Sequence, residues 1–205
     1  MARRVLLVLL APVAWTPPGT DPARWRTALA EDVVDLIATL SEVEPAIATT
    51  AADRPLAEAV AWPGMPIYEL ASRTVGAAFA AAAADGYDQA AVIAADAPDV
   101  PALILGKLLR PLTSRPVSVA PSRAAGPDGV ANPGLFGVAA RLPAPDWLPE
   151  IDLDTAEAAT LRAAAPQPGD VVLTAAWRRL RGPADLATLN PAVEGWETTR
   201  TLLGG

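Results

Sequence analysis

The sequence predicts a single α/β domain in which helices cover both faces of a mostly parallel β-sheet. Short apolar runs alternate along the chain with segments of helical periodicity, as in repeated strand–helix units. The 205 residues are 52% hydrophobic and 19% charged, a composition that can bury a sizeable core. The chain contains no internal repeat and no linker-like stretch, so residues 1–205 are expected to form one domain.

The first strand is expected at residues 5–10, where the run VLLVLL precedes an alanine and a proline. With the two arginines before it, this run also resembles a secretory signal. Its shortness and the lack of cysteine in the chain favour a buried strand, and we expect a cytoplasmic protein. No stretch approaches the roughly 20 apolar residues of a membrane span.

The remaining elements follow from apolar runs, caps and prolines. Asp21 and Pro22 are typical of a helix start. Ser72 is expected to cap an alanine-rich helix, and Pro101 to lie in the first turn of the next one. The expected strands after the first are residues 45–50, 66–70, 90–95, 116–122, 135–140 and 170–177. The expected helices are residues 22–40, 56–60, 72–86, 101–112, 155–165 and 182–189.

Two loops are candidates for a ligand site, because parallel sheets bind ligands beyond the carboxyl ends of their strands. They are residues 11–21 and residues 96–101. The second follows a strand that is apolar throughout and ends on Asp96. An acid at this position is suited to bind Mg²⁺. The alternative is that Asp96 and Asp99 cap the following helix, and this role fits Asp99 better.

The composition excludes several kinds of chemistry. The chain has no histidine and no cysteine, which rules out His or Cys catalysis, disulfides and the usual zinc sites. A metal would have to bind oxygen ligands, which favours Mg²⁺ or Mn²⁺. The net charge of −7 argues against sequence-independent nucleic-acid binding, which needs many cationic phosphate contacts.

Three segments carry a family resemblance in their order and spacing. They are APVAWTPPGTDPARWR at residues 11–26, AADAPDVP at 94–101 and NPGLFGVAA at 132–140. With them the chain resembles the small bacterial nucleotide-diphospho-sugar-transferase-like proteins of the glycosyltransferase-A fold, relatives of the guanylyltransferases that build molybdopterin and deazaflavin cofactors. The resemblance covers residues 5–189.

The resemblance implies transfer of a nucleotidyl or glycosyl group from a nucleotide or nucleotide-sugar donor. It assigns Asp96 the catalytic position and the binding of Mg²⁺ or Mn²⁺. It also implies that the first loop holds the nucleotide, with Pro12, Val13, Gly19 and Arg24 as contact residues. Partners would be small molecules and not nucleic acids or membranes, and the sequence leaves the oligomeric state open.

The sequence departs from the family at two places. The Lys-Thr-Arg stretch of the first loop is missing, which leaves only Arg24 and Arg26 nearby. In RLRGPADL, Arg179 and Arg181 stand where the family has two metal-binding acids. We therefore expect the two arginines to contact phosphate directly, and the protein alone to bind no Mg²⁺ or Mn²⁺.

Weaker candidates have ordinary structural alternatives. Asp152 and Asp154 would add metal ligands, but Asp154 with Glu157 also matches a helix capping box. Trp15 and Trp62 lie in loops and would stack on a base or sugar near the cleft. Because the basic loop and the terminal acids are eroded, a non-catalytic relative that binds a ligand or a partner protein is the alternative function.

Overall fold

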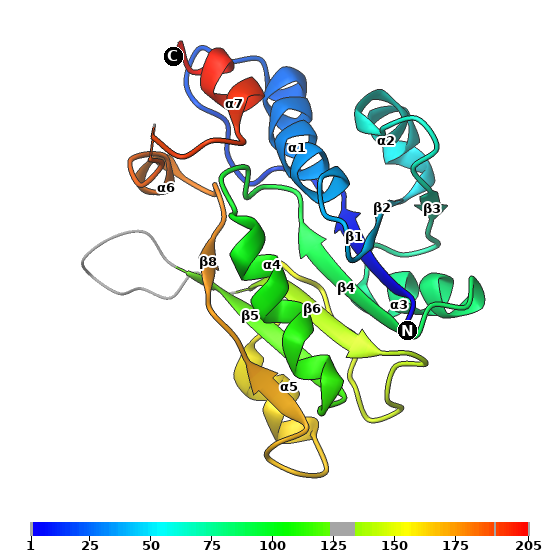
Figure 1. Ribbon diagram of the computed structural model, residues 1–205. Coiled ribbons are helices and arrows are strands. Elements are labelled where there is room, and N and C mark those ends of the chain that lie inside the picture. Colours follow the sequence, from blue (N-terminus) through cyan, green and yellow to red (C-terminus); the bar gives the residue numbers. More distant parts are fainter. Residues whose placement is uncertain (1, 124–133, 191, 205) are drawn as a thin grey trace.

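The computed structural model describes residues 2–123, 134–190 and 192–204, and it confirms the α/β class (Figure 1). The strands are β1 (Arg4–Leu9), β2 (Glu44–Thr49), β3 (Ile67–Glu69), β4 (Gln89–Ala94), β5 (Val117–Arg123), β6 (Leu135–Arg141), β7 (Val171–Leu173) and β8 (Trp177–Arg178). The helices are α1 (Pro22–Ala38), α2 (Arg54–Val60), α3 (Val75–Ala84), α4 (Ala102–Leu109), α5 (Ala158–Ala164), α6 (Pro183–Leu186) and α7 (Glu197–Leu202), with 3-10 turns at Ala51–Asp53 and Arg110–Thr113.

The described strands form one mixed sheet with the order β3-β2-β1-β4-β6-β5-β7, and β8 extends the pairing of β5. All pairings are parallel except those of β6, which runs antiparallel to both β4 and β5. The expectation of a mostly parallel sheet is thus confirmed. β4 lies near the centre and is buried along its whole length, as the small-apolar run of residues 90–94 after Gln89 indicates.

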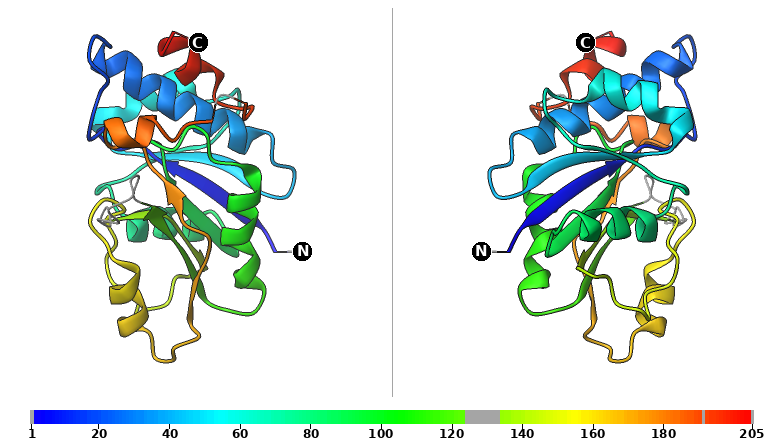
Figure 2. Two further views of the ribbon diagram at one scale, coloured as in Figure 1. Left: turned by 90° about the vertical axis from the view of Figure 1, so that its left-hand side faces the viewer. Right: turned by 90° about the vertical axis from the view of Figure 1, so that its right-hand side faces the viewer.

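Helices cover both faces of the sheet (Figure 2). Along β1, alternate side chains enter different cores: Leu7 packs with α3 and α5, whereas Leu6 packs with α1, α2 and α4. This division follows from the two-residue period of a strand. A strand that is covered on both faces must be apolar at every position, which explains the unbroken run VLLVLL.

A third, smaller cluster attaches the C-terminal segment to α1. Trp25 of α1 is fully buried there against Leu29 and Leu180. Trp15 from the first loop meets the Trp25 ring edge-on, with centroids 6.3 Å apart, and its carbonyl oxygen accepts a hydrogen bond from Trp25 Nε1. Trp15 is therefore held against α1 by packing and is half-buried, and its stacking on a ligand stays a prediction.

Several expected element boundaries are wrong. Thr74, and not Ser72, caps α3 through a bond from the Ala77 amide. The expected strand at 170–177 is divided into β7 and β8. Helix α7 was not expected, because its six-residue sequence ETTRTL carries little apolar periodicity. Within the described ranges, no helix is both long and apolar enough to cross a membrane.

Contacts with Asp32 of α1 hold the polar helix α7 in place. Its buried carboxylate accepts bonds from the amides of Thr198 and Thr199, at 3.0 and 2.8 Å, at the start of α7. These amides are among the donors that a helix leaves unpaired at its first turn. Burial raises the pKa of Asp32, which the bonds from Thr199 and Thr198 only partly offset.

We predict that Asp32→Ala releases α7 from α1. The amides of Thr198 and Thr199 lose their acceptor, which should cost about 1–3 kcal/mol of unfolding free energy. Amide hydrogen exchange over residues 197–202 should accelerate. The control is Glu31→Ala, which removes the neighbouring half-exposed acid of the same helix. Unchanged exchange in Asp32→Ala, or equal acceleration in both variants, would contradict this role of Asp32.

Candidate functional site

The carboxyl ends of β1 and β4 lie side by side, because the strands pair in parallel with Leu9 opposite Ala94. The loops that follow them leave from the same edge of the sheet. A narrow hollow between the loops is lined by Pro12 and Val13 from the first and by Asp96 from the second. The structure thus brings Asp96 beside the first loop, as the sequence predicted.

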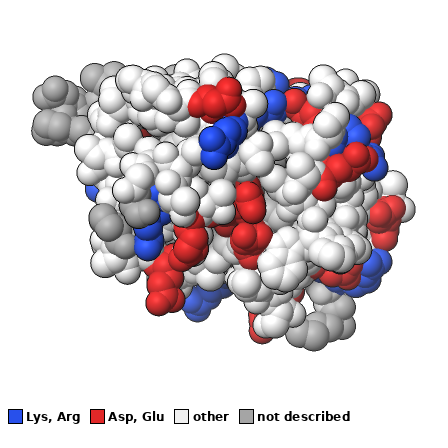
Figure 3. Space-filling model, turned by 90° about the horizontal axis from the view of Figure 1, so that it is seen from above, with Lys and Arg blue, Asp and Glu red and all other residues white. Residues whose placement is uncertain are grey.

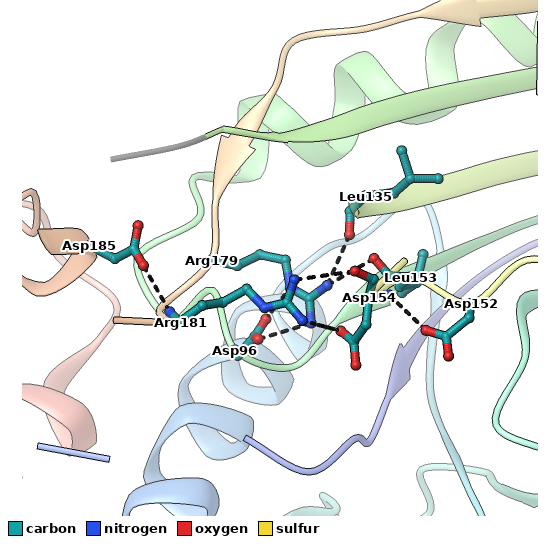
Figure 4. Close-up of polar contacts among 8 residues, drawn as sticks. All are labelled: Asp96, Leu135, Asp152, Leu153, Asp154, Arg179, Arg181 and Asp185. Carbon is teal, nitrogen blue, oxygen red and sulfur yellow. Dashed lines mark hydrogen bonds and ion pairs between the residues drawn. The ribbon is translucent and has the colours of Figure 1, made fainter. Parts of the chain in front are cut away.

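Arg179 enters this edge from the chain after β8, and its side chain is 2% exposed (Figure 4). Its Nε donates to Oδ1 of Asp96 at 2.6 Å, and its Nη2 donates to Oδ2 of Asp96 at 2.9 Å and to Oδ1 of Asp154 at 2.7 Å. Its Nη1 donates to the carbonyl oxygens of Leu135 and Leu153, at 3.2 and 3.1 Å. A guanidinium has five N–H groups, and all five of Arg179 have acceptors within the protein.

The charge of Arg179 is stable in this environment. Burial alone would lower the pKa of Arg179, but the attraction of Asp96 and the bonds to Asp96 and Asp154 outweigh it, so the pKa lies above its ordinary value. Bidentate, charge-assisted bonds of this kind are the strongest that side chains make. The edge of the sheet therefore holds a permanent cation between two carboxylates.

The chain around Arg179 is fixed by main-chain and ionic contacts. β8 extends along the end of β5, and the Leu180 amide then bonds to the Asp96 carbonyl oxygen at 2.7 Å. Next to it, Arg178 pairs with the fully buried carboxylate of Asp99. Burial raises the pKa of Asp99, and the attraction of Arg178 only partly offsets it. Two consecutive arginines thus neutralise two aspartates of one loop.

Gly134 allows the segment that carries the Leu153 carbonyl oxygen to lie close to the start of β6. Its φ of +115° favours glycine, and a Cβ there would lie 2.7 Å from the carbonyl oxygen of Leu153. The close approach lets the Leu135 amide bond to that oxygen at 2.8 Å, which fixes the chain containing Leu153 and Asp154 against the start of β6. Any side chain at position 134 would push this segment away from Arg179.

The acids Asp152 and Asp154 reach the site in different ways. The Asp154 amide bonds to Oδ1 of Asp152 at 2.7 Å, which tightens the turn that aims the Asp154 carboxylate at Arg179. Arg181 also lies within 3.1 Å of Oδ1 of Asp154 through its Nη2, and its own amide bonds to Oδ2 of Asp185 at 3.0 Å. Arg179 and Arg181 therefore face the same carboxylate, which fits their two-residue spacing in the chain after β8.

The capping roles considered for these acids are wrong. The N-cap of α4 is Pro101, without a side-chain hydrogen bond, so neither Asp96 nor Asp99 caps that helix. The N-cap of α5 is Glu157, so Asp154 does not form a capping box. In each case an arginine is the stronger partner, because a carboxylate that is largely removed from water needs a positive charge nearby.

Other candidate residues lie outside the contacts of Arg179. Gly19 has a φ of +82° in the turn before α1, and Asp21 caps that helix through the Arg24 amide, at 2.8 Å. The exposed Arg24 lines an open groove of about 770 Å³ between α1 and α7. Trp62 lies before the start of β3, at the edge of the sheet opposite to the site. Its side chain is 49% exposed, and its Nε1 donates a hydrogen bond to Asp35. The expectation that it stacks in the cleft is therefore wrong.

Sequence reasoning missed Arg73, which lies between β3 and α3. It is half-buried and lines a second hollow with Asp152, Asp154 and Arg179. Among the residues that the structure describes, its guanidinium makes no hydrogen bond or ion pair, although its charge helps to lower the pKa of Asp53. Because β3 is also parallel to its neighbour, the strand-end rule would have pointed to this loop too.

Arg26 holds the first loop in place. Its Nε donates to the Ala11 carbonyl oxygen at 2.9 Å and its Nη1 donates to Oδ1 of Asp53 at 2.7 Å, while its Nη2 forms an ion pair with Oδ2 of Asp53 at 2.7 Å. The bond with Arg26 lowers the pKa of Asp53. Arg26 is thereby occupied within the protein, although the sequence left it as one of the two basic residues of the eroded loop.

The residues at this edge do not fit a divalent metal ion. Within the described ranges, no three acidic, histidine or cysteine side chains are grouped to hold one. The carboxylates of Asp96 and Asp154, the natural oxygen ligands, hold the guanidinium of Arg179 between them. A metal ion would have to displace a buried arginine from five hydrogen bonds.

The face of the molecule at the top of Figure 1, where α1 and α7 lie, carries both signs of charge. In Figure 3, acidic and basic side chains are interspersed over an otherwise uncharged surface. Nucleic acid would require a dominant basic stripe. The described residues that Figure 3 shows form no such stripe.

No family profile and no curated protein matches this sequence. Solved structures do match. A candidate nucleotide-diphospho-sugar transferase from Desulfovibrio desulfuricans G20 is 16% identical, with a TM-score of 0.66 over 100% of this chain and 96% of that one. The 4-diphosphocytidyl-2C-methyl-D-erythritol synthase from Anaerococcus prevotii is 9% identical, with a TM-score of 0.57 over 98% and 96%.

A third similar structure is glucosyl-3-phosphoglycerate synthase from Mycobacterium tuberculosis, in complex with Mn²⁺, UDP-glucose and phosphoglyceric acid. It is 15% identical, with a TM-score of 0.56 over 98% of this chain and 77% of that one. These likenesses confirm the glycosyltransferase-A type of fold that the sequence motifs predicted.

We predict that Arg179→Met strongly destabilises the protein. Methionine fills much of the volume but leaves the buried carboxylate of Asp96 without a counter-charge and Asp154 with only its ion pair to Arg181, which should cost about 3–5 kcal/mol. Urea unfolding measures the loss. Arg54→Met is the control, because Arg54 forms an exposed i,i+4 pair with Glu58 on α2 and should cost under about 0.5 kcal/mol. Similar losses in the two variants would refute the structural role of Arg179.

Proposed function

We propose that the protein binds a nucleotide or nucleotide sugar at the carboxyl edge of β1 and β4 and transfers a nucleotidyl or glycosyl group from it. The meeting of Pro12, Val13, Asp96 and Arg179 at this edge carries the proposal. Sheets of this kind hold ligands where strands end and loops diverge. The transferase folds among the structural neighbours support the same assignment.

In this proposal catalysis comes from positioning and from neutralising phosphate charge. Pro12 and Val13 contact the nucleoside. Arg73 and Arg181, at the rim around Asp154, contact the phosphates. Asp96 is a positioning residue, because it acts through Arg179 and not through a metal. The amides before α1 at Gly19, with Arg24, form an outer contact for a longer ligand.

Arg179 has a different part from the one the sequence suggested. All five of its N–H groups are used within the protein, so a direct bond to phosphate would require it to leave Asp96, Asp154 or a carbonyl. We therefore assign it the role of a fixed charge beneath the ligand.

The second candidate function is a non-catalytic relative that binds another molecule. The observation that favours it is the small space at the site. The two hollows beside Arg179 enclose about 10 Å³ each, room for about one water molecule. Ligand pockets usually enclose about 300–1,000 Å³. A nucleotide would therefore bind across the rim, or the first loop would move to admit it.

We predict that a nucleotide or nucleotide sugar raises the melting temperature of the protein and binds in calorimetric titration. A panel of nucleoside triphosphates, diphosphates and their sugar conjugates would identify it. Arg73→Ala should weaken this binding about tenfold or more, since a charge-assisted bond to phosphate is lost.

The matched control for that experiment is Arg110→Ala, which removes an exposed arginine at the opposite edge of the sheet. Its affinity should equal that of the wild type. If no member of the panel binds, the non-catalytic relative is the better assignment. If binding occurs and Arg73→Ala leaves it unchanged, the phosphates lie elsewhere than at the rim.

A further inference from the structure

We propose that Arg179 is a built-in cation that fills an oxygen cage in place of a divalent metal ion. Its guanidinium would then keep the site charged without any added ion. The consequence that ligand binding is independent of metal rests on the proposed function. The cage itself does not, since it is formed by residues of the folded protein alone.

The cage consists of oxygen atoms only. Two carboxylate oxygens come from Asp96, one from Asp154, and two carbonyl oxygens from Leu135 and Leu153, all within 3.2 Å of a nitrogen of Arg179. Carboxylate and carbonyl oxygens are the ligands that hard divalent cations take from proteins. The same set of acceptors also satisfies a guanidinium completely, because five oxygens match five N–H groups.

The charges balance as they would around a divalent ion. Asp96 and Asp154 contribute two negative charges, and Arg179 and Arg181 contribute two positive charges around Asp154. One divalent cation in place of both arginines would give the same sum, whereas an ion in place of Arg179 alone would leave one positive charge in excess, because Arg181 stays beside Asp154. An ion added to the intact site would instead bring two further positive charges beside the arginines, in a partly buried place where screening is weak.

The main chain keeps Arg179 directed into the cage. The Leu180 amide is bonded to the Asp96 carbonyl oxygen, and the Arg181 amide is bonded to Asp185. Leu180 itself is buried in the cluster with Trp25. Since side chains alternate along an extended chain, anchoring Leu180 on one side directs Arg179 to the other. The main-chain contacts of Leu180 and Arg181 therefore keep the start of the Arg179 side chain facing the cage.

Manganese titration followed by electron paramagnetic resonance tests the proposal, because free and bound Mn²⁺ give different signals. The wild type should show no saturable site. Arg179→Ala empties the cage and should gain one site per chain, at least tenfold tighter than any binding to the wild type. Its melting temperature should rise with Mn²⁺, since an ion that binds only the folded state stabilises it.

Two matched variants test whether the Mn²⁺ site gained in Arg179→Ala depends on the emptied cage. Arg179→Met also removes the charge, but its side chain occupies the cage, so it should not gain the site. Asp96→Asn combined with Arg179→Ala removes a carboxylate from the cage and should abolish the gain. Nucleotide binding by the wild type should be unchanged by a chelator, and this arm alone depends on the proposed function.

The outcomes are distinct. Saturable Mn²⁺ binding to the wild type centred on Asp96 would overturn the proposal, as would a folded Arg179→Ala protein without a gained site. If Arg179→Ala folds only with Mn²⁺ present, the ion has replaced the guanidinium and the proposal is supported. Failure to fold even with Mn²⁺ counts against the cage. Failure of nucleotides to bind, with the manganese results as expected, would reject the proposed function and leave the cage intact.

Discussion

The buried contact of Arg179 with Asp96 and Asp154 organises the ligand edge of this molecule. It joins the end of β4, the segment that approaches Gly134 and the chain that leaves β8. Removing such charges from water costs several kcal/mol per ion, so the contact is stable only when every donor and acceptor is used. The five bonds of Arg179 meet that condition. Three distant segments must therefore arrive together for any one of them to be in place.

Much of the fold was predictable because it depends on local patterns. The buried run VLLVLL, the apolar run of residues 90–94 in β4 and the Asp21-Pro22 helix start each specify an element without reference to distant residues. The position of Asp96 next to the first loop also followed, since parallel strands end at one edge. The elements that the sequence did not predict are polar or short. Helix α7 is held by Asp32, which is 166 residues away from Thr198 along the chain, and no local pattern reveals that contact.

The candidate site was predictable in its residues more than in their partners. Asp96, Asp154, Arg179 and Arg181 were all singled out, but their pairing was not, because Arg179 is 83 residues from Asp96 and 25 from Asp154. Local reasoning gave the acids helix-capping roles, the nearest use for an aspartate before a helix. Burial changes that outcome. A carboxylate that caps a helix at the surface only replaces a hydrogen bond to water with one to an amide. A buried carboxylate needs a nearby cation, so the distant arginines are stronger partners than the nearby amides.

A fixed guanidinium and a bound metal ion differ in what they leave for a ligand. A metal ion shares its coordination between protein and phosphate oxygens, so one ion both holds the acids and contacts the substrate. The five donors of Arg179 are all directed at the protein, so its charge acts on a ligand only through space. Contact with phosphate must then come from other cations at the rim, and the structure places Arg73 and Arg181 beside Asp154. Two roles that one metal ion would combine are thereby separated. The buried Arg179 neutralises the acids, and the rim arginines Arg73 and Arg181 are placed to bind phosphate.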